Sequence, residues 1–397
     1  MKRCCKNIDI TDRNLIEEAT RDCLYGKMNR PDTIRMFSEY SGLSYDLIKD
    51  ISKNTYAMEG LINTVIDGIQ QEIINKKYVV KPIRYRKQVD GCNGKVRNIG
   101  IQDVKQQIYD YIAVYAMDEL FRKKLGFYQC GALKKKGNEF GSKAIKKWVN
   151  NHNMRWAWQA DIRHYYETIP KAKLKSLLCR DVDNPNILHL VFFLIDTFDG
   201  GLSIGSYLSQ YLANYYMSYA YHYASEQLIK KRRHKNGDSD VKVLLSHVLF
   251  QMDDILFVSK SLKDLKMAVR WFSKYVKEFL GLELKDTAKF IDLRTDYIDI
   301  LGRKISRRSL TVRSSNFIRF RRTANKVRIL IHQNKEIPLS LAKSYIGRYG
   351  AIKHSDTKKF QRKYHVLEDL KRCKNVVSVY ERRKHKYENN EIQYTAA

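Results

Sequence analysis

Three aspartates at two places in the chain are candidate ligands for divalent metal ions. Asp161 ends an apolar segment that begins at residue 155, and Asp253 and Asp254 interrupt two apolar runs within residues 244–260. A carboxylate beside apolar residues is costly unless it is paired or bound to a metal, and clustered carboxylates repel one another. Mg²⁺ accepts carboxylate oxygens and leaves positions open for phosphate, which would suit displacement at phosphorus. The simpler interpretation of Asp253 and Asp254 is a polar turn between two strands.

The charge of the chain indicates a polyanionic partner. The 397 residues include 74 Lys and Arg but only 43 Asp and Glu, which gives a net charge of +31. Residues 302–397 carry 25 basic and 7 acidic side chains, a net charge of +18, whereas residues 1–80 carry 12 of each. Such a concentration is typical of nucleic-acid binding, and the alternative is a solvated basic surface. An apolar fraction of 44% excludes a disordered chain.

Apolar periodicity predicts the elements that must position these residues. A strand is expected to end at Asp161, and a long helix is expected within residues 201–224. Further expected helices lie within 8–78, 263–280 and 316–395, and expected β-hairpins within 79–102, 244–260 and 296–313. The longest apolar run, 187–198, is too short to cross a bilayer and predicts a buried helix. The first residues lack the apolar region of a signal peptide, so we expect a cytoplasmic protein without membrane contact.

Three ordered segments resemble the A, B and C motifs of reverse transcriptases. They are ADIRHYYETIP at 160–170, GLSIGSYLSQYLANYYMS at 201–218 and QMDDILF at 251–257. Three more segments extend the resemblance over about residues 80–310, because they are similar to the family's fingers segment, motif D and primer grip. These are KVRNIGIQ at 95–102, LGLELKDTAK at 280–289 and YIDILGRKIS at 297–306.

The resemblance implies an α+β right-hand polymerase with fingers, palm and thumb. The expected parts are a helical N-terminal extension over 1–78, fingers over 79–155, a palm over 156–300 with part of the fingers interleaved, and a primer grip with a basic helical thumb over 301–397. The implied activity is RNA-directed DNA polymerisation from dNTPs on a template RNA, giving an RNA–DNA duplex. The implied cofactors are two Mg²⁺ ions, with Mn²⁺ as a substitute, in a bacterial or phage-encoded protein.

The resemblance also assigns roles around the reacting phosphate. Asp161, Asp253 and Asp254, with the backbone carbonyl of Ile162, match the family's metal ligands. Tyr166 matches the ring that excludes a ribose 2′-hydroxyl, and its alternative role is packing, because Tyr165 is adjacent. Lys289 matches a proton donor to the leaving pyrophosphate, although Lys285 is close enough to compete.

Nucleotide and nucleic-acid contacts are implied at further positions. The dNTP contacts are Lys95, Arg97, Ile204 and Gly205, with Arg84 as a further candidate and a solvated hairpin face as the alternative. The primer-grip turn would be Leu301 and Gly302. The residues expected to follow duplex phosphates are Arg319, Arg321, Arg322 and Lys326, for which the alternative is a solvated helix surface.

Some positions depart from the usual family pattern and point to a subtype. Gln251 replaces an aromatic residue before the motif C acids, Ile204 replaces a polar side chain beside the nucleotide, and Gln210 replaces a proline. The Ile-Gly-x-x-x-Ser-Gln form resembles the enzymes of diversity-generating retroelements, which are error-prone and misincorporate opposite adenines of the template RNA. Loss of a hydrogen-bonding side chain at Ile204 would weaken discrimination between nucleotides.

Other interpretations stay open at the level of sequence. The main alternative is an antiphage defence reverse transcriptase that copies a non-coding RNA or makes DNA without a template. Another is a basic RNA chaperone with a degenerate polymerase fold. A third hypothesis makes residues 1–78 the docking surface for a small accessory protein.

Overall fold

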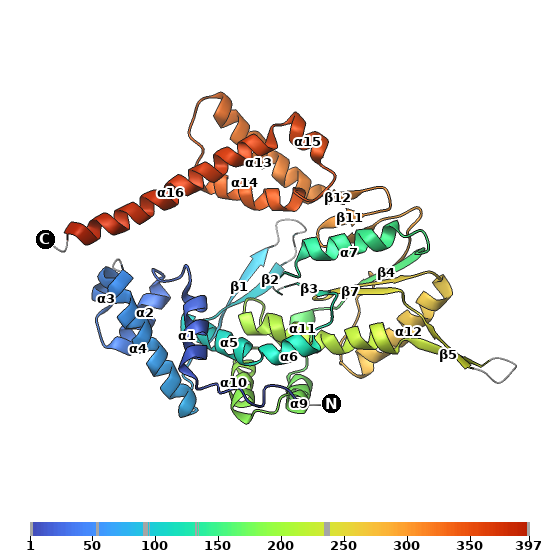
Figure 1. Cartoon of the computed structure of the whole chain (residues 1–397), viewed down its shortest axis with the longest axis horizontal. Helices are drawn as coiled ribbons and strands as arrows, with labels where there is room; N and C mark the ends of the chain where they lie inside the picture. The colour runs from blue at the N-terminus through green and yellow to red at the C-terminus, as the bar shows by residue number, and fades with distance from the viewer. Residues whose placement is uncertain are drawn as a thin grey trace. The chain divides into compact units, whose positions relative to one another are not determined.

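The computed structural model describes residues 3–52, 55–89, 94, 96–131, 133, 135–233 and 239–394 (Figure 1). The chain forms two compact units, each built from several segments. The first contains Met1–Ala132, Ile162–Gln227 and Arg270–Asp286, and the second contains Leu133–Asp161, Leu228–Val269 and Thr287–Ala397. Helices and small sheets occur together, so the expected mixture of α and β structure is confirmed.

The first unit is mainly helical. Its strands are β1 (Arg84–Val89), β2 (Val96–Ile101) and β3 (Gln129–Cys130). Its helices up to residue 124 are α1 (Arg13–Leu24), α2 (Pro31–Ser41), α3 (Tyr45–Ile51), α4 (Thr55–Ile74), α5 (Val104–Ala116) and α6 (Asp118–Lys124). The later ones are α8 (Tyr165–Thr168), α9 (Lys171–Asp181), α10 (Pro185–Asp196), α11 (Tyr207–His222) and the π-helical turn η1 (Tyr223–Gln227).

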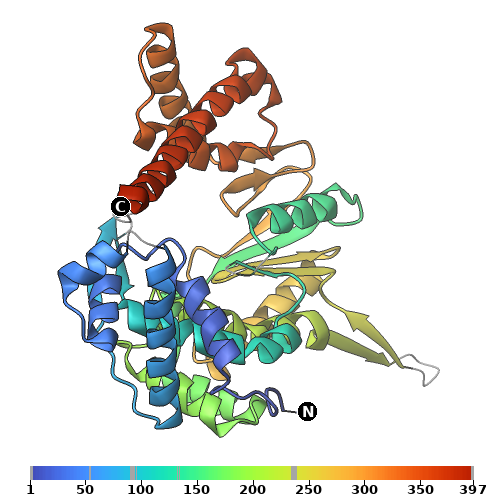
Figure 2. The same cartoon turned by 60° about the vertical axis from the view of Figure 1, so that its left-hand side comes forward.

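Helix α1 illustrates how the sequence determines these elements. The Asp12 side chain caps its first turn by accepting a hydrogen bond from the backbone N–H of Asn14. Ile16, Ala19 and Cys23 recur at helical spacing and are fully buried. Through this apolar face α1 packs against α4 and α5, and Figures 1 and 2 show α1, α2 and α4 side by side.

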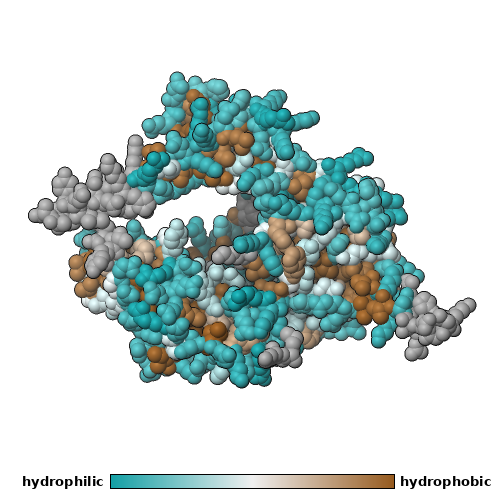
Figure 3. Space-filling view, viewed as in Figure 1, coloured by the Kyte–Doolittle hydropathy of each residue, from teal (hydrophilic) through white to brown (hydrophobic). Residues whose placement is uncertain are grey.

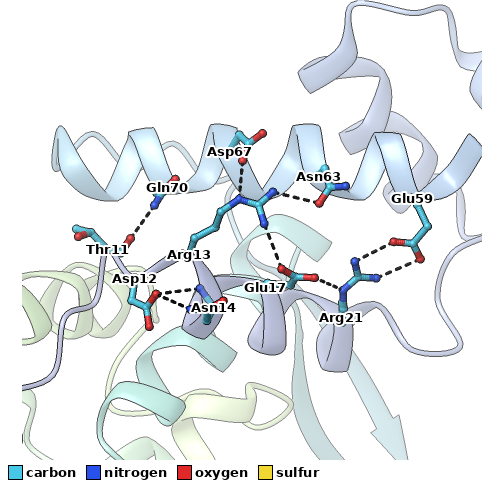
Figure 4. A network of polar contacts seen from close by, with 10 residues as sticks. All are labelled: Thr11, Asp12, Arg13, Asn14, Glu17, Arg21, Glu59, Asn63, Asp67 and Gln70. Carbon is cyan, nitrogen blue, oxygen red and sulfur yellow. Dashed lines mark hydrogen bonds and ion pairs between the residues drawn. The ribbon is translucent and has the colours of Figure 1, made fainter.

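A polar network joins the outer faces of α1 and α4 (Figure 4). Arg13 donates hydrogen bonds to Asn63 and Asp67 of α4, and Arg21 forms an ion pair of 2.8 Å with Glu59. Glu17 accepts a hydrogen bond from each arginine. These side chains are partly exposed, so the network fixes the pairing of the two helices more than it stabilises the fold.

The N-terminal segment is part of the core of the first unit. Cys4 pairs with Val182 in a parallel β-bridge, and both Cys4 and Cys5 are buried. Glu72 near the end of α4 forms an ion pair of 2.7 Å with Lys105 of α5. Residues 3–74 are therefore integrated with α5 and with the residues that follow α9.

The second unit contains the larger sheet, in which β7 (His247–Gln251), β8 (Asp254–Ser259), β4 (Trp156–Asp161) and β9 (Lys289–Asp292) lie in this order and pair antiparallel. Helix α7 (Asn138–Asn150) packs on β7. The unit also contains the hairpin β5 (Ile229–Arg233) and β6 (Ser239–Val243), and the small sheet β10 (Ile298–Ile300), β11 (Arg303–Ile305) and β12 (Leu310–Val312). Helix α12 (Leu262–Glu278) runs from the second unit into the first.

The C-terminal helices of the second unit enclose a core of their own. They are α13 (Ser314–His332), α14 (Leu339–Ile352), α15 (Lys358–Lys363) and α16 (Val366–Tyr394). Phe320 and Tyr345 are fully buried at its centre and meet edge to face, with ring centroids 5.2 Å apart. The Tyr345 hydroxyl donates to the carbonyl of Val366, so this tyrosine packs helices together. None of the helices in the described ranges is long and apolar enough to span a membrane.

Candidate active site

Strand pairing in the second unit brings two of the three candidate aspartates opposite each other. The register of β4 and β8 pairs Asp161 with Asp254, at the last residue of one strand and the first of the other. Directly opposite residues of antiparallel strands present their side chains on the same face. Both side chains are half-buried, whereas Ile255 and Ala160 beside them are buried. The sequence predicted this strand and this hairpin, and their pairing places two carboxylates on neighbouring strands.

A two-residue turn holds the third aspartate. Gln251 pairs with Asp254 in the β7–β8 hairpin, so Met252 and Asp253 are its central residues. Met252 has a φ of 55°, a left-handed conformation that is costly for a residue with a side chain. The burial of β7 and β8 on both sides of the turn supports this conformation. Asp253 is therefore fixed next to the Asp161–Asp254 pair.

The chemistry of this set suits a hard cation. All candidate ligands offer oxygen, which is the donor that Mg²⁺ and Mn²⁺ prefer. Nevertheless, within the described ranges no three His, Cys, Asp or Glu side chains form a ready-made metal site. The carboxylates would have to converge on the ion, and the register of β4 and β8 already places Asp161 and Asp254 side by side.

Gln251 contributes a polar group beside the aspartates. Its amide nitrogen donates to the Asn138 side chain at the start of α7, at 3.3 Å. Its amide oxygen is buried and accepts no hydrogen bond from the residues that the structure describes. An unsatisfied buried oxygen is costly, and this one lies next to the turn that carries Asp253.

The two adjacent tyrosines of the first unit, Tyr165 and Tyr166, lie in different environments. Tyr165 is 3% exposed, and its hydroxyl donates to the carbonyl of Ala213 in α11 at 2.5 Å. Tyr166 is half-buried, and its ring meets that of Tyr165 edge to face. The backbone carbonyl of Tyr166 accepts a hydrogen bond from Leu202. Packing is therefore the role of Tyr165, and the Tyr166 ring is the one that remains accessible.

The loop before α11 runs along the edge of β2. The Gly100 amide donates to the carbonyl of Ile204 at 2.7 Å. Gly205 has a φ of 114°, and a Cβ there would lie 2.5 Å from the carbonyl oxygen of Gly100. The resemblance assigned this glycine to close approach of a nucleotide, and in the structure close approach of two backbones already requires it.

The β1–β2 hairpin gathers arginines on one face. Its register pairs Arg84 with Ile101, Arg86 with Ile99 and Gln88 with Arg97. Because paired residues share a face, Arg84, Arg86 and Arg97 point the same way, and all three are exposed. Three guanidinium groups on one face can bind phosphate oxygens. Lys95, the other expected triphosphate contact, lies outside the described residues.

The two candidate lysines near motif D occupy different positions. Lys289 is the first residue of β9, is exposed, and pairs with Gln159, two residues before Asp161 on β4. Lys285 precedes the strand and is half-buried. Ile162, whose carbonyl was assigned to a metal, forms an antiparallel bridge with Leu284.

The expected primer-grip turn is a tight turn in the second unit. Leu301 and Gly302 connect β10 and β11, and their φ angles are 59° and 73°. Two consecutive positive φ angles define a type I′ hairpin turn. Leu301 is 7% exposed, so its side chain is packed in the interior and helps to hold the turn in place.

A basic pocket opens between α13 and α14. Its volume is about 570 Å³, and its lining includes Arg319, Arg322, Lys326 and Arg348 with the hydroxyl side chains of Ser340 and Ser344. Arg319, Arg322 and Lys326 share one face because they are three and four residues apart. Arg321 is exposed but does not line the pocket. Figure 3 shows a mostly hydrophilic surface over these helices.

Sequence reasoning missed Arg348 because it lies on the next helix. Its guanidinium hydrogen-bonds to the Thr323 hydroxyl of α13, which holds it at the pocket. The expected basic helix gave no indication of which residue of α14 would face it. The β5–β6 hairpin was also not predicted, although Asn236-Gly237 in the sequence between its strands is a turn signal.

Comparison with known proteins assigns no family to this arrangement. A scan against protein-family models gives no match, and no curated protein matches the chain.

Proposed function

We propose that this protein is an RNA-directed DNA polymerase of the right-hand type, which adds deoxynucleotides to a primer on a template RNA. The observation that supports this proposal best is the pairing of Asp161 with Asp254, with Asp253 in the adjoining turn. Two acids on neighbouring strands, both half-buried at strand ends, suit metal-assisted phosphoryl transfer better than they suit a structural turn.

The proposal gives each candidate residue a task. Asp161, Asp253 and Asp254 would hold the metal ions, with the Ile162 carbonyl as a further ligand. When bound, the ions would stabilise charge on the reacting phosphate. Arg97 and its neighbours on the β1–β2 hairpin would bind the triphosphate, and Tyr166 would contact the sugar. Lys289 would donate a proton to pyrophosphate as it leaves.

The basic C-terminal helices support the choice of a nucleic-acid substrate. The pocket lined by Arg319, Arg322 and Lys326 is suited to phosphate groups, and residues 302–397 have a net charge of +18. A right-hand arrangement would make these helices the thumb. The sequence form around Ile204 favours an error-prone enzyme of the diversity-generating type, with an antiphage defence enzyme as the alternative.

Primer extension tests the activity directly. The full chain is incubated with a DNA primer annealed to a defined RNA, four dNTPs and Mg²⁺. Asp253→Asn keeps the size of the side chain but removes its charge, so we expect synthesis to fall at least about 100-fold. RNA affinity should not change. Asp196→Asn, at an exposed carboxylate at the end of α10, is the matched control and should retain activity.

Sequencing the product distinguishes the subtypes. Errors concentrated opposite template adenine would support the diversity-generating enzyme, and product unrelated to the RNA would support the defence enzyme. Equal synthesis by wild-type protein and Asp253→Asn would refute the polymerase and leave an RNA-binding role.

A further inference from the structure

A fully buried carboxylate lies behind the loop that carries Ile204 and Gly205. Asp110 of α5 is 0% exposed and has no role in the chemistry proposed above. Its Oδ2 accepts a hydrogen bond of 2.6 Å from the Ser206 hydroxyl and one of 3.3 Å from the Leu208 amide. Burying a carboxylate is costly, so the burial of Asp110 calls for a specific explanation.

The hydrogen bonds of Asp110 converge on the start of α11. Ser206 is the N-cap of that helix, and its hydroxyl oxygen accepts from the Ser209 amide at 3.0 Å. The free N–H groups at a helix start carry partial positive charge, so a carboxylate there is favoured. Asp110 and Ser206 together satisfy the Leu208 and Ser209 amides and fix where α11 begins.

The residues just before Ser206 are tied at two more points. The Leu202 amide donates to the Tyr166 carbonyl, and the Gly100 amide donates to the Ile204 carbonyl, each at 2.7 Å. Asp110 holds the C-terminal end of the same loop. Loop 202–206 is thus fixed to α8, to β2 and to α5 within one compact unit.

We propose that Asp110 is a positioning residue that holds loop 202–206 against β2 and thereby sets the affinity of the enzyme for the incoming nucleotide. The inference rests on the proposed function, in which this loop contacts the dNTP. In that function, Ile204 and Gly205 would reach the nucleotide through backbone and apolar contacts, which depend on how accurately the loop is placed. Asp110 itself, fully buried behind Ser206, acts only through the loop.

A purely structural role would have different consequences. A buried polar residue that only stabilises the unit would lower its stability when replaced, but it would not change KM for dNTP separately from kcat. Replacement of a residue that positions the loop should specifically loosen the hydrogen bond between the Gly100 amide and the Ile204 carbonyl. The two roles are therefore separable by experiment.

The test compares two substitutions in the full chain. Asp110→Ala removes the acceptor, whereas Asp110→Asn keeps an oxygen that can accept from Ser206 and Leu208. Ile112→Val, at a fully buried position on the same helix, controls for general destabilisation. Hydrogen exchange at the Gly100 amide reports on the loop, and primer extension gives KM and kcat.

We expect exchange at Gly100 and KM for dNTP to rise at least about 10-fold in Asp110→Ala, because the Ser206 hydroxyl and the Leu208 amide both lose a charged acceptor. Asp110→Asn should restore both values to near wild type, and Ile112→Val should change neither. Unchanged Gly100 exchange and KM in Asp110→Ala would overturn the proposal. If the wild-type chain makes no DNA, the proposed function fails, whereas exchange at Gly100 still decides whether Asp110 holds the loop.

Discussion

At the scale of single residues, Tyr165 and Tyr166 show how adjacent identical side chains occupy different environments, one buried and one half-buried. We expect Tyr166→Val to increase ribonucleotide incorporation relative to deoxynucleotide about 10- to 100-fold, because the ring that would meet a 2′-hydroxyl is removed. Tyr165→Phe is the matched control. It should leave sugar selectivity unchanged and lower the free energy of unfolding by about 0.5–1.5 kcal/mol, because the hydrogen bond from the Tyr165 hydroxyl to the Ala213 carbonyl is lost. Competition assays with paired rNTP and dNTP measure the first effect.

Equal selectivity in wild type and Tyr166→Val would remove this tyrosine from the proposed nucleotide site. The sequence could place the pair next to Asp161 but could not distinguish its members. Which ring turns inward depends on α11, 48 residues away in the chain, and periodicity over a four-residue helix carries no such information.

The buried Asp110 leads to a second prediction at the scale of single residues, which concerns how the stability of the fold changes with pH. Burial raises the pKa of Asp110 from 3.8 to about 6, although its hydrogen bonds to Ser206 and Leu208 oppose the rise. Between these values the folded chain holds a proton that the unfolded chain has released, so the stabilising contribution of Asp110 falls as pH rises. The difference amounts to about 2 kcal/mol between pH 4 and pH 7.

Asp110→Asn does not titrate, so its stability relative to wild type should improve by up to that amount over the same range. Urea unfolding of both proteins at several pH values measures the difference. A difference that stays constant with pH would show that Asp110 has an ordinary pKa in the folded protein.

At the scale of elements, the pocket between α13 and α14 predicts which basic residues contact phosphate. Arg319→Ala, Arg322→Ala and Lys326→Ala should each reduce the slope of log affinity against log salt by about 1 for an RNA–DNA duplex, because each lost phosphate contact retains one counterion. Arg321→Ala removes the same charge outside the pocket and should leave the slope nearly unchanged. Fluorescence anisotropy over a salt series provides the measurement.

If Arg321→Ala lowers the slope as much as the pocket variants, the basic helix binds through its charge and the pocket has no special role. The sequence identified this helix and its charge, and helical spacing already separates Arg321 from the other three. The sequence could not identify Arg348, because the face that α14 turns toward α13 is determined by the buried contact between Phe320 and Tyr345.

The sequence also predicted the strands better than their pairing. The apolar runs before Asp161 and on both sides of Asp253-Asp254 predicted a strand and a hairpin, and both are present. The sequence could not predict the register that pairs Asp161 with Asp254, because pairing depends on side-chain packing between distant segments. The short strand β3 and the hairpin β5–β6 have too few alternating apolar residues to stand out in the sequence.

At the scale of the whole molecule, the N-terminal helices belong to the first unit and are not a detachable cap. A chain that lacks residues 1–78 would lose the buried Ile16, Cys23 and Leu24 of α1 and would expose the face of α5 that they cover. Each buried apolar side chain contributes about 1.5–3 kcal/mol. We therefore expect the shortened chain to have a lower Tm and to bind a hydrophobic dye.

Arg21→Ala is the control for this experiment, because it breaks only the partly exposed pairs with Glu17 and Glu59. It should lower the free energy of unfolding by less than about 1 kcal/mol. A shortened chain with the Tm of wild type and the same yield in the primer-extension assay would contradict the integration of the N-terminal helices. It would also exclude an accessory-protein site there that the reaction needs.

The register of β4 and β8 has a consequence for how the gene can change. Side chains along a strand alternate between faces, so the loss or gain of a single codon within 156–161 would turn Asp161 away from Asp254 and exchange the environments of Ala157 and Trp158. Substitutions in these strands change one side chain at a time, whereas a one-codon slip changes every contact at once. In this part of the coding sequence, length should therefore be under stronger selection than the identity of any residue except the aspartates.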